Sequence, residues 1–408
     1  MDFDYARIYR LKGQVQHYAW GGRDFISDLT GIPNPDHQPV AEYWMGAHQS
    51  APAGVVLDHK AIYPLDQVVE AAPVKALGPE VEKLFHRLPY LFKILDVREM
   101  LSIQVHPGKQ NAEYEFSREN AEGIALTDPR RNYKDNNHKP ELSYAISEIR
   151  LLHGFKPADE LAATLEEYAE FRDLLRLFLE QGYEALYREV MNMSQEKVNA
   201  ILQPILDRII PLYEKGELSK DEEDYWAARA ARIFDQPGKI DRGIFSIYLF
   251  NLVLFKPGEA IFQDAGLPHA YLEGQMAEIM ANSDNVLRGG LTVKHVDVKE
   301  LMKHVVCEPT HPRILKPELE PPCEKVFKTP APDFELRLFE LSAGQRAGFR
   351  ATTTEILFVL DGAIELKGDN QLKLRRGEAA VLFAGVPAEL DALSDSRVLR
   401  ATVPVHNR

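Results

Sequence analysis

Two segments of this chain align with each other without a gap, and this internal repeat limits the folds that the chain can adopt. Residues 256–269 and 375–388 both have the pattern of a turn, a buried strand and a second turn. Matching positions are Gly258 with Gly377, Glu259 with Glu378, Gly266 with Gly385, and Pro268 with Pro387. The repeat predicts two β-barrels of similar build, although two Gly/Pro turns can also resemble each other by chance. His269 is Ala388 in the second copy, so only the first barrel keeps an imidazole there.

Strand-like sequence dominates from Tyr18 to about Ile149. Residues 90–95 and 101–105 form short runs of aromatic and branched residues, which are typical of buried strands. Strand-like sequence returns at Ile244 and continues through residues 247–255.

The periodicity between these regions is helical. Apolar residues recur every three or four positions from Leu161 to Phe178, as on one face of an amphipathic helix. Ser194 is expected to open a further helix, and Ser219 with Glu222 forms a capping-box pattern. We therefore predict a mainly β protein with an α-helical insertion. The expected divisions are a first barrel from 1–155 and 241–315, a helical insertion at 156–240, and a second barrel at 316–408.

The composition limits the partners and the compartment. The 408 residues carry a formal net charge of −14, which argues against general binding to nucleic acid or acidic membranes. No apolar run is long enough to span a bilayer, and Met1–Leu11 lacks the apolar core of a signal peptide. The two cysteines, Cys307 and Cys323, fit no zinc-binding spacing and suit a reducing compartment. We expect a cytoplasmic protein, either a monomer or a weak homo-oligomer.

Three separated segments contain candidate metal ligands. Gln104 and His106 alternate with Val105, so a strand places both side chains on one face. Glu141 and His269 each follow a proline that fixes the entry to a strand. Taken alone, each residue can be an ordinary surface or hydrogen-bonded side chain. Together, two imidazoles, a carboxylate and an amide oxygen suit zinc, and manganese, iron or cobalt also fit.

Further charged residues occur in apolar or glycine-rich surroundings. Arg288 precedes Gly289 and Gly290, which allow close approach of a ligand, and its guanidinium can steady a developing oxyanion. Lys93 interrupts an apolar run, so it is either an edge lysine that reaches solvent or a contact for an anion.

At this point the chain resembles a known family, the type I phosphomannose isomerases. The resemblance rests on motifs in the family's order: Tyr18-Ala-Trp-Gly21, Ala41–Gly46, the 90–95 strand, Gln104-x-His106-Pro107, Asn137-His-Lys-Pro-Glu141 and the block Pro268–Lys294. Tyr43 departs from the family, which more often has an aliphatic residue there. From Pro317 onward the sequence has the strand pattern of a barrel but none of the family's catalytic motifs.

The resemblance implies a catalytic cupin-like barrel, a helical insertion and a second cupin-like barrel without metal. It also implies one zinc ion held by Gln104, His106, Glu141 and His269, with Arg288 in the active site. The implied activity interconverts mannose 6-phosphate and fructose 6-phosphate, and a hexose phosphate is the expected small-molecule partner.

Aldose–ketose isomerisation through a cis-enediol needs a base and groups that stabilise charge. Glu278 is the first candidate for the base and Lys139 the second. Candidate substrate contacts are Lys93, Ser102, Tyr271, Asp284 and Lys294, and His138 or Asp284 could assist ring opening. Two other functions stay open on the residues alone. Two histidines and a glutamate also suit a non-haem iron enzyme, and a non-catalytic sugar-binding cupin protein could use the metal for folding.

Overall fold

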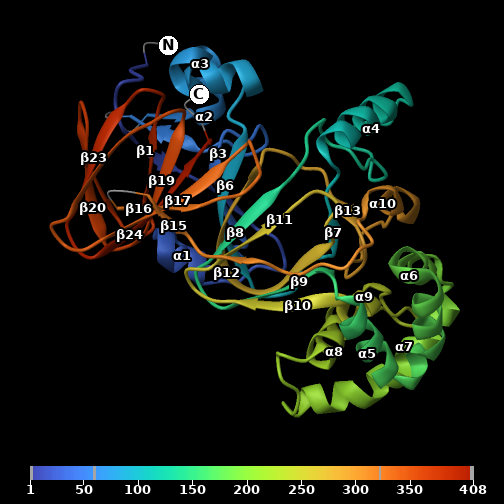
Figure 1. Ribbon diagram of the computed structural model, residues 1–408. Coiled ribbons are helices and arrows are strands. Elements are labelled where there is room, and N and C mark those ends of the chain that lie inside the picture. The colour runs from blue at the N-terminus through green and yellow to red at the C-terminus, as the bar shows by residue number, and fades with distance from the viewer. Residues whose placement is uncertain (1–2, 58–60, 321–322, 405–408) are drawn as a thin grey trace.

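The computed structural model describes residues 3–57, 61–320 and 323–404. Its strands form three sheets, and helices cover their edges or gather in a separate lobe (Figure 1). The largest sheet follows the order β14 (Ile314–Leu315), β11 (Ala260–Gln263), β8 (Glu141–Ala145), β12 (His269–Ala281), β6 (Tyr90–Val97), β3 (Glu42–Gly46), β2 (Gln14–Gln16). Four further strands join it beside this path: β7 (Gln104–Val105), β9 (Ile149–Phe155), β10 (Phe250–Phe255) and β13 (Leu287–Arg288).

The other two sheets contain the C-terminal strands. The nine-stranded sheet has the order β15 (Glu318–Glu320), β16 (Glu324–Phe327), β17 (Glu335–Leu341), β24 (Ser396–Thr402), β19 (Glu355–Asp361), β22 (Ala379–Leu382), β1 (Tyr9–Lys12), β4 (Gly54–Val56), β5 (Ile62–Pro64). The small sheet has the order β18 (Arg346–Arg350), β23 (Pro387–Ala392), β20 (Ala363–Lys367), β21 (Gln371–Arg375). The sheet-rich class is thus confirmed, but no sheet closes into a barrel within the described residues.

The internal repeat is visible as the same local structure in both copies. The strand of the first copy is β11 and that of the second is β22. The turns before them place Gly258 at φ 90° and Gly377 at φ 81°, a left-handed conformation that favours glycine. In each turn the glutamate after the glycine accepts a hydrogen bond from a backbone N–H three residues earlier, at 2.8 Å in both copies. The repeated sequence therefore encodes a repeated turn.

Strand β12 connects two halves of the large sheet. Its C-terminal part pairs with β6 and β8, whereas its start pairs with β7 and β9. The register shifts between Tyr271 and Glu273, and Gly274 has φ 130°. A side chain at Gly274 would meet the Glu148 carbonyl oxygen at 2.5 Å, so glycine allows this bend. The bend brings side chains of both halves to one site.

Helices α5 to α9 form the lobe at the lower right of Figure 1. Their bounds are α5 (Ala158–Glu167), α6 (Arg172–Asn192), α7 (Gln195–Glu214), α8 (Glu223–Phe234) and α9 (Gly243–Leu249), with a 3-10 turn at Ala169–Phe171. The remaining helices are α1 (Phe25–Thr30), α2 (Leu65–Ala71), α3 (Pro73–Phe85), α4 (Lys109–Ala121) and α10 (Val298–His304). None of those in the described part of the chain has the length and hydropathy needed to cross a bilayer.

Several local predictions differ from the structure. The expected single helix at Leu161–Phe178 is broken at Tyr168, whose backbone is extended. Ser194 caps α7 as predicted, but Ser219 does not cap α8, which begins at Glu223. Residues 244–249 form helix α9 instead of a strand, because a helix buried on every side shows no amphipathic period. Of residues 101–105, only Gln104 and Val105 are in a strand.

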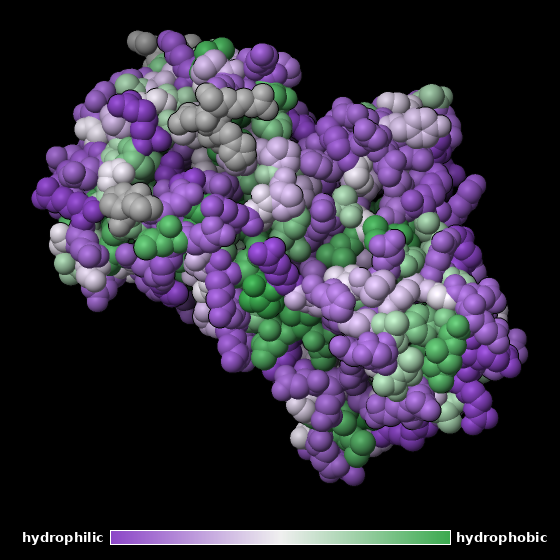
Figure 2. Space-filling model, in the orientation of Figure 1, coloured by the Kyte–Doolittle hydropathy of each residue, from purple (hydrophilic) through white to green (hydrophobic). Residues whose placement is uncertain are grey.

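The surface seen in Figure 2 is largely polar. In Figure 2 hydrophilic residues predominate, and the main hydrophobic area of this face lies near the middle of the view, between the sheets and the helical lobe.

Candidate metal centre and its surroundings

Three predicted ligands converge from three segments. Glu141 begins β8, His269 begins β12 and His106 follows β7, and one ligand atom of each lies within 4.8 Å of the others. The Nε2 atoms of His106 and His269 are 3.5 Å and 3.2 Å from the two oxygens of Glu141. All three side chains are buried. The sequence-based grouping of these residues therefore matches their position in the fold.

Both imidazoles are oriented as ligands. Nδ1 of His106 lies 2.7 Å from the Asn285 carbonyl oxygen, and Nδ1 of His269 lies 3.0 Å from that of Leu267. A ring that donates from Nδ1 keeps a lone pair on Nε2, the arrangement typical of metal-bound histidines. Nε2 of His106 is buried and has no hydrogen-bond partner. Burial, followed by the charge of Lys139, lowers the pKa of His106 to about 4, so the ring is neutral.

Gln104 lies on the same face as the histidine of β12. Its Cα is directly opposite His269 on one side and opposite Arg288 on the other. Directly opposed residues of antiparallel strands project to the same face. The register thus places the predicted amide ligand and the predicted active-site arginine beside the metal centre.

Lys139 contacts the metal centre directly. Its Nζ lies 2.7 Å from Oε1 of Glu141. Burial alone would raise the pKa of Glu141, but the charge of Lys139 is the largest opposing influence, and that pKa lies well below its usual range. Glu141 is therefore a carboxylate, as a cation ligand must be.

A second buried group lies across β6, β12 and β8. Lys93, Glu278 and Ser143 are in register, and Nζ of Lys93 lies 3.0 Å from Oε2 of Glu278. The hydroxyl of Tyr271 donates to Oε1 of Glu278 at 2.9 Å and also contacts Ser143. Burial raises the pKa of Glu278, although Lys93 opposes the shift. Lys93 lies inside the protein and also over the ring of Trp44, so it is not an edge lysine that reaches solvent.

Arg288 and Lys294 are neighbouring cations without an acidic partner in the described residues. Burial lowers the pKa of Arg288, and burial together with the charge of Arg288 lowers the pKa of Lys294. Ser102 lies close to the segment of Arg288, because the next residue, Ile103, forms backbone hydrogen bonds with Gly289 and Gly290. This arrangement suits an anionic ligand.

The two candidates for ring opening have other partners. Asp284 lies 3.3 Å from Nε2 of His48, and that contact outweighs burial to lower the pKa of Asp284. His138 lies 2.7 Å from Asp333, at a contact with the C-terminal part of the chain. Three further residues contact this site without being predicted from the sequence: His48 beside Asp284, Glu42 at 3.7 Å from Nζ of Lys93, and Asn285 beside His106. Their roles depend on contacts between distant segments, and no local pattern signals such contacts.

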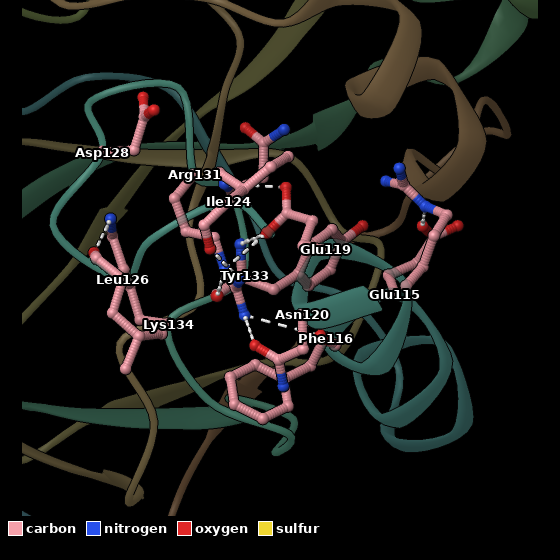
Figure 3. Close-up of polar contacts among 12 residues, drawn as sticks. Glu115, Phe116, Glu119, Asn120, Ile124, Leu126, Asp128, Arg131, Tyr133 and Lys134 are labelled. Carbon is pink, nitrogen blue, oxygen red and sulfur yellow. Dashed lines mark hydrogen bonds and ion pairs between the residues drawn. The ribbon is translucent and has the colours of Figure 1, made fainter. Parts of the chain in front are cut away.

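The loop that leads to Lys139 and Glu141 is stabilised by a buried ion pair (Figure 3). Nε of Arg131 lies 2.8 Å from Glu119 of helix α4, whose carboxylate also accepts hydrogen bonds from the N–H groups of Asn132 and Tyr133. The Arg131 guanidinium donates to the carbonyl oxygens of Tyr133 and Ile124, both at 2.6 Å.

Replacing Arg131 with methionine is expected to lower the free energy of unfolding by about 3–5 kcal/mol, because it leaves a buried carboxylate unpaired. Urea denaturation of the wild type and the variant measures this loss. Arg130→Met is the matched control, since Arg130 is exposed and its one ion pair within the described residues is with the neighbouring Asp128. The control is expected to unfold like the wild type, and equal losses in both variants would contradict a special role for the buried pair.

Comparison with known proteins agrees with this geometry. A family model described as phosphomannose isomerase type I, catalytic domain, matches residues 8–158. A mannose-6-phosphate isomerase of Shigella flexneri is 37% identical over 382 residues, which cover 92% of this chain and 94% of that protein. The chain belongs to the type I phosphomannose isomerase family. The mannose-6-phosphate isomerase of Rattus norvegicus is 33% identical over 98% of this chain and 96% of its own length.

Solved structures of phosphomannose isomerases have the same fold. The Salmonella typhimurium mannose 6-phosphate isomerase bound to fructose 6-phosphate and zinc superposes with a TM-score of 0.87 at 33% identity, and it covers 98% of this chain and 100% of its own. Another mannose 6-phosphate isomerase structure, bound with zinc and yttrium, gives the same TM-score and coverage.

Proposed function

We propose that Gln104, His106, Glu141 and His269 hold one zinc ion, at which mannose 6-phosphate and fructose 6-phosphate are interconverted. As a member of its family, the chain is an aldose–ketose isomerase. The observation that carries the proposal is the convergence of two neutral imidazoles and a carboxylate, with Nε2 of His106 buried and without a hydrogen bond. A buried polar atom without a partner is costly, and a bound cation would supply the missing interaction.

The donor set fits zinc, since imidazole nitrogen and carboxylate oxygen are its usual ligands besides thiolate. When bound, zinc would act as a Lewis acid on the oxygens of the substrate. The Salmonella typhimurium relative is described as bound to zinc and to fructose 6-phosphate, which supports the same pairing here.

The remaining side chains can perform the proton transfer and bind the anion. Arg288 would stabilise negative charge on the enediol oxygens, because a guanidinium stays protonated. Lys294 and Ser102 would bind the phosphate, and Lys93, Tyr271 and Asp284 would contact the sugar. Glu278 would take the proton between C1 and C2, and its raised pKa makes it a stronger base than an exposed glutamate. Lys139 is the alternative base.

The finer architecture also belongs to this proposal. We infer two cupin-like barrels, the first built from 1–155 and 241–315 and the second from 316–408, with a helical insertion at 156–240. The left-handed glycine turn and strand that recur in the two halves support this division. A cytoplasmic location, a monomeric or weakly associated state and the absence of nucleic-acid or membrane partners complete the proposal.

The alternatives receive less support. The relatives reported above are all named mannose-6-phosphate isomerases, so a non-haem iron enzyme or a sugar-binding protein without catalysis would depart from the family.

The proton-transfer route is tested by turnover of mannose 6-phosphate in D₂O. We expect deuterium at C2 of the recovered mannose 6-phosphate, because a proton held by a side chain exchanges with solvent before it is returned. NMR or mass spectrometry of substrate and product measures the label, and a reaction without protein corrects for spontaneous exchange. Full turnover without any label would indicate hydride transfer between C1 and C2.

A further inference from the structure

One buried asparagine connects the segments that carry the metal ligands. Asn285 is 1% exposed, and among the described residues its side chain bonds only to the backbone and side chains of the loop before Glu141. Its Oδ1 accepts hydrogen bonds from the N–H groups of Lys134 and Asp135, at 2.7 Å and 3.3 Å. Its Nδ2 donates to the carbonyl oxygens of Asp135 and Asn137, at 2.8 Å and 2.9 Å. Both ends of the amide are therefore used.

The backbone of the same residue contacts a metal ligand. The carbonyl oxygen of Asn285 accepts the hydrogen bond from Nδ1 of His106. Asn285 thus bonds through its main chain to the segment of His106, and through its side chain to the segment that continues to Lys139 and Glu141. Three residues further along its own segment lies Arg288.

Neighbouring contacts reinforce this connection. Oδ2 of Asp135 accepts a hydrogen bond from the N–H of Asp284 at 2.7 Å, and Oδ1 accepts one from the Ser283 hydroxyl at 2.8 Å. Ser283 also contacts the Asn137 carbonyl oxygen at 3.2 Å. We call Asp135, Asn137, Ser283 and Asn285 the loop clasp.

We propose that Asn285 is a positioning residue that fixes the distance between His106 and Glu141 and thereby sets the affinity for the metal. The inference rests on the proposed zinc site. His106 and Glu141 belong to segments that are not paired with each other in the sheet, so their spacing depends on contacts such as this one. Groups that orient metal ligands typically contribute a factor of about 10–100 to metal affinity.

The test compares Asn285→Ala with Asn370→Ala. Asn370 is a suitable control because its amide also joins two distant segments, by accepting from the N–H of Ile8 and donating to its carbonyl oxygen. It lies in the loop between β20 and β21, far from the metal ligands in the chain. Zinc affinity is measured by competition with a chromophoric chelator, and the thermal unfolding midpoint is measured on each metal-free protein.

We expect Asn285→Ala to bind zinc about 10–100-fold more weakly than the wild type and Asn370→Ala to bind it with unchanged affinity, even where both midpoints fall. Unchanged zinc affinity in a folded Asn285→Ala protein would overturn the inference and leave the zinc site intact. A wild-type protein that binds no zinc would overturn the proposed site itself. Should Asn285→Ala fail to fold, Ser283→Ala replaces it, since that variant removes only a hydroxyl from the clasp and is expected to weaken zinc binding in the same direction.

Discussion

Replacing His269 with alanine should remove the bound zinc and lower kcat/KM by a factor of about 10³ or more. The imidazole supplies one of the three ligand atoms that converge within 4.8 Å, and its Nε2 is directed at Glu141. A Lewis acid contributes several kcal/mol to the stabilisation of transition-state charge, and each 1.4 kcal/mol corresponds to about a tenfold change in rate. Metal analysis of the purified variant, together with a mannose 6-phosphate turnover assay, measures both effects.

His304→Ala provides the matched control. His304 is also buried and belongs to the other cluster with metal-ligand geometry, together with Glu115 and Glu300. That cluster already has two cations beside its two carboxylates, because Lys303 lies 2.8 Å from Glu300 and 3.2 Å from Glu115, and Arg118 also pairs with Glu115. We expect this control to retain one zinc ion per chain. Loss of zinc from His304→Ala alone would show that the metal binds at the cluster of Glu115, Glu300 and His304, and would contradict the proposed site.

Replacing Arg288 with alanine should lower kcat by about 10²–10³ while the zinc content stays at the wild-type level. Removing one preorganised donor from a site of developing negative charge costs about this much. Arg288 is half-buried and has no carboxylate partner among the described residues, so its charge remains available to a ligand. Steady-state kinetics separate kcat from KM, and metal analysis on the same sample excludes indirect loss of zinc.

Arg288→Lys should recover only part of this activity, because an ammonium cannot replace the two-pronged geometry of a guanidinium. Arg346→Ala is the control for removal of a surface charge, since that side chain is 65% exposed on β18. If Arg288→Ala changes KM alone, the residue binds the substrate without stabilising the transition state.

The sequence was most informative where function depends on local geometry. Alternation along one strand was sufficient to predict that Gln104 and His106 share a face, and the prolines before Glu141 and His269 marked two further candidate ligands. Their convergence could only be expected from the family resemblance. The glycine turn that recurs at Gly258 and Gly377 was equally local, and both copies form the predicted turn, with the glycine at positive φ.

Long-range register was not predictable in the same way. The opposition of Lys93 and Glu278 across β6 and β12 depends on how two strands align, and neither segment alone encodes that alignment. Helix α9 was missed because its residues are buried on all sides, so the apolar run had neither a strand period nor a helix period. Asn285 gave no signal, because its hydrogen bonds reach residues about 150 positions away in the chain.

The position of β1 in its sheet matters while the chain is being synthesised. This strand, at Tyr9–Lys12, lies between β4 and β22, so its hydrogen bonds on one side are to a strand from the last tenth of the chain. During translation β1 emerges early and must wait with one edge unpaired until β22 leaves the ribosome. An unpaired edge is a site for aggregation. The pairing of β1 is therefore completed only after β22 has been synthesised.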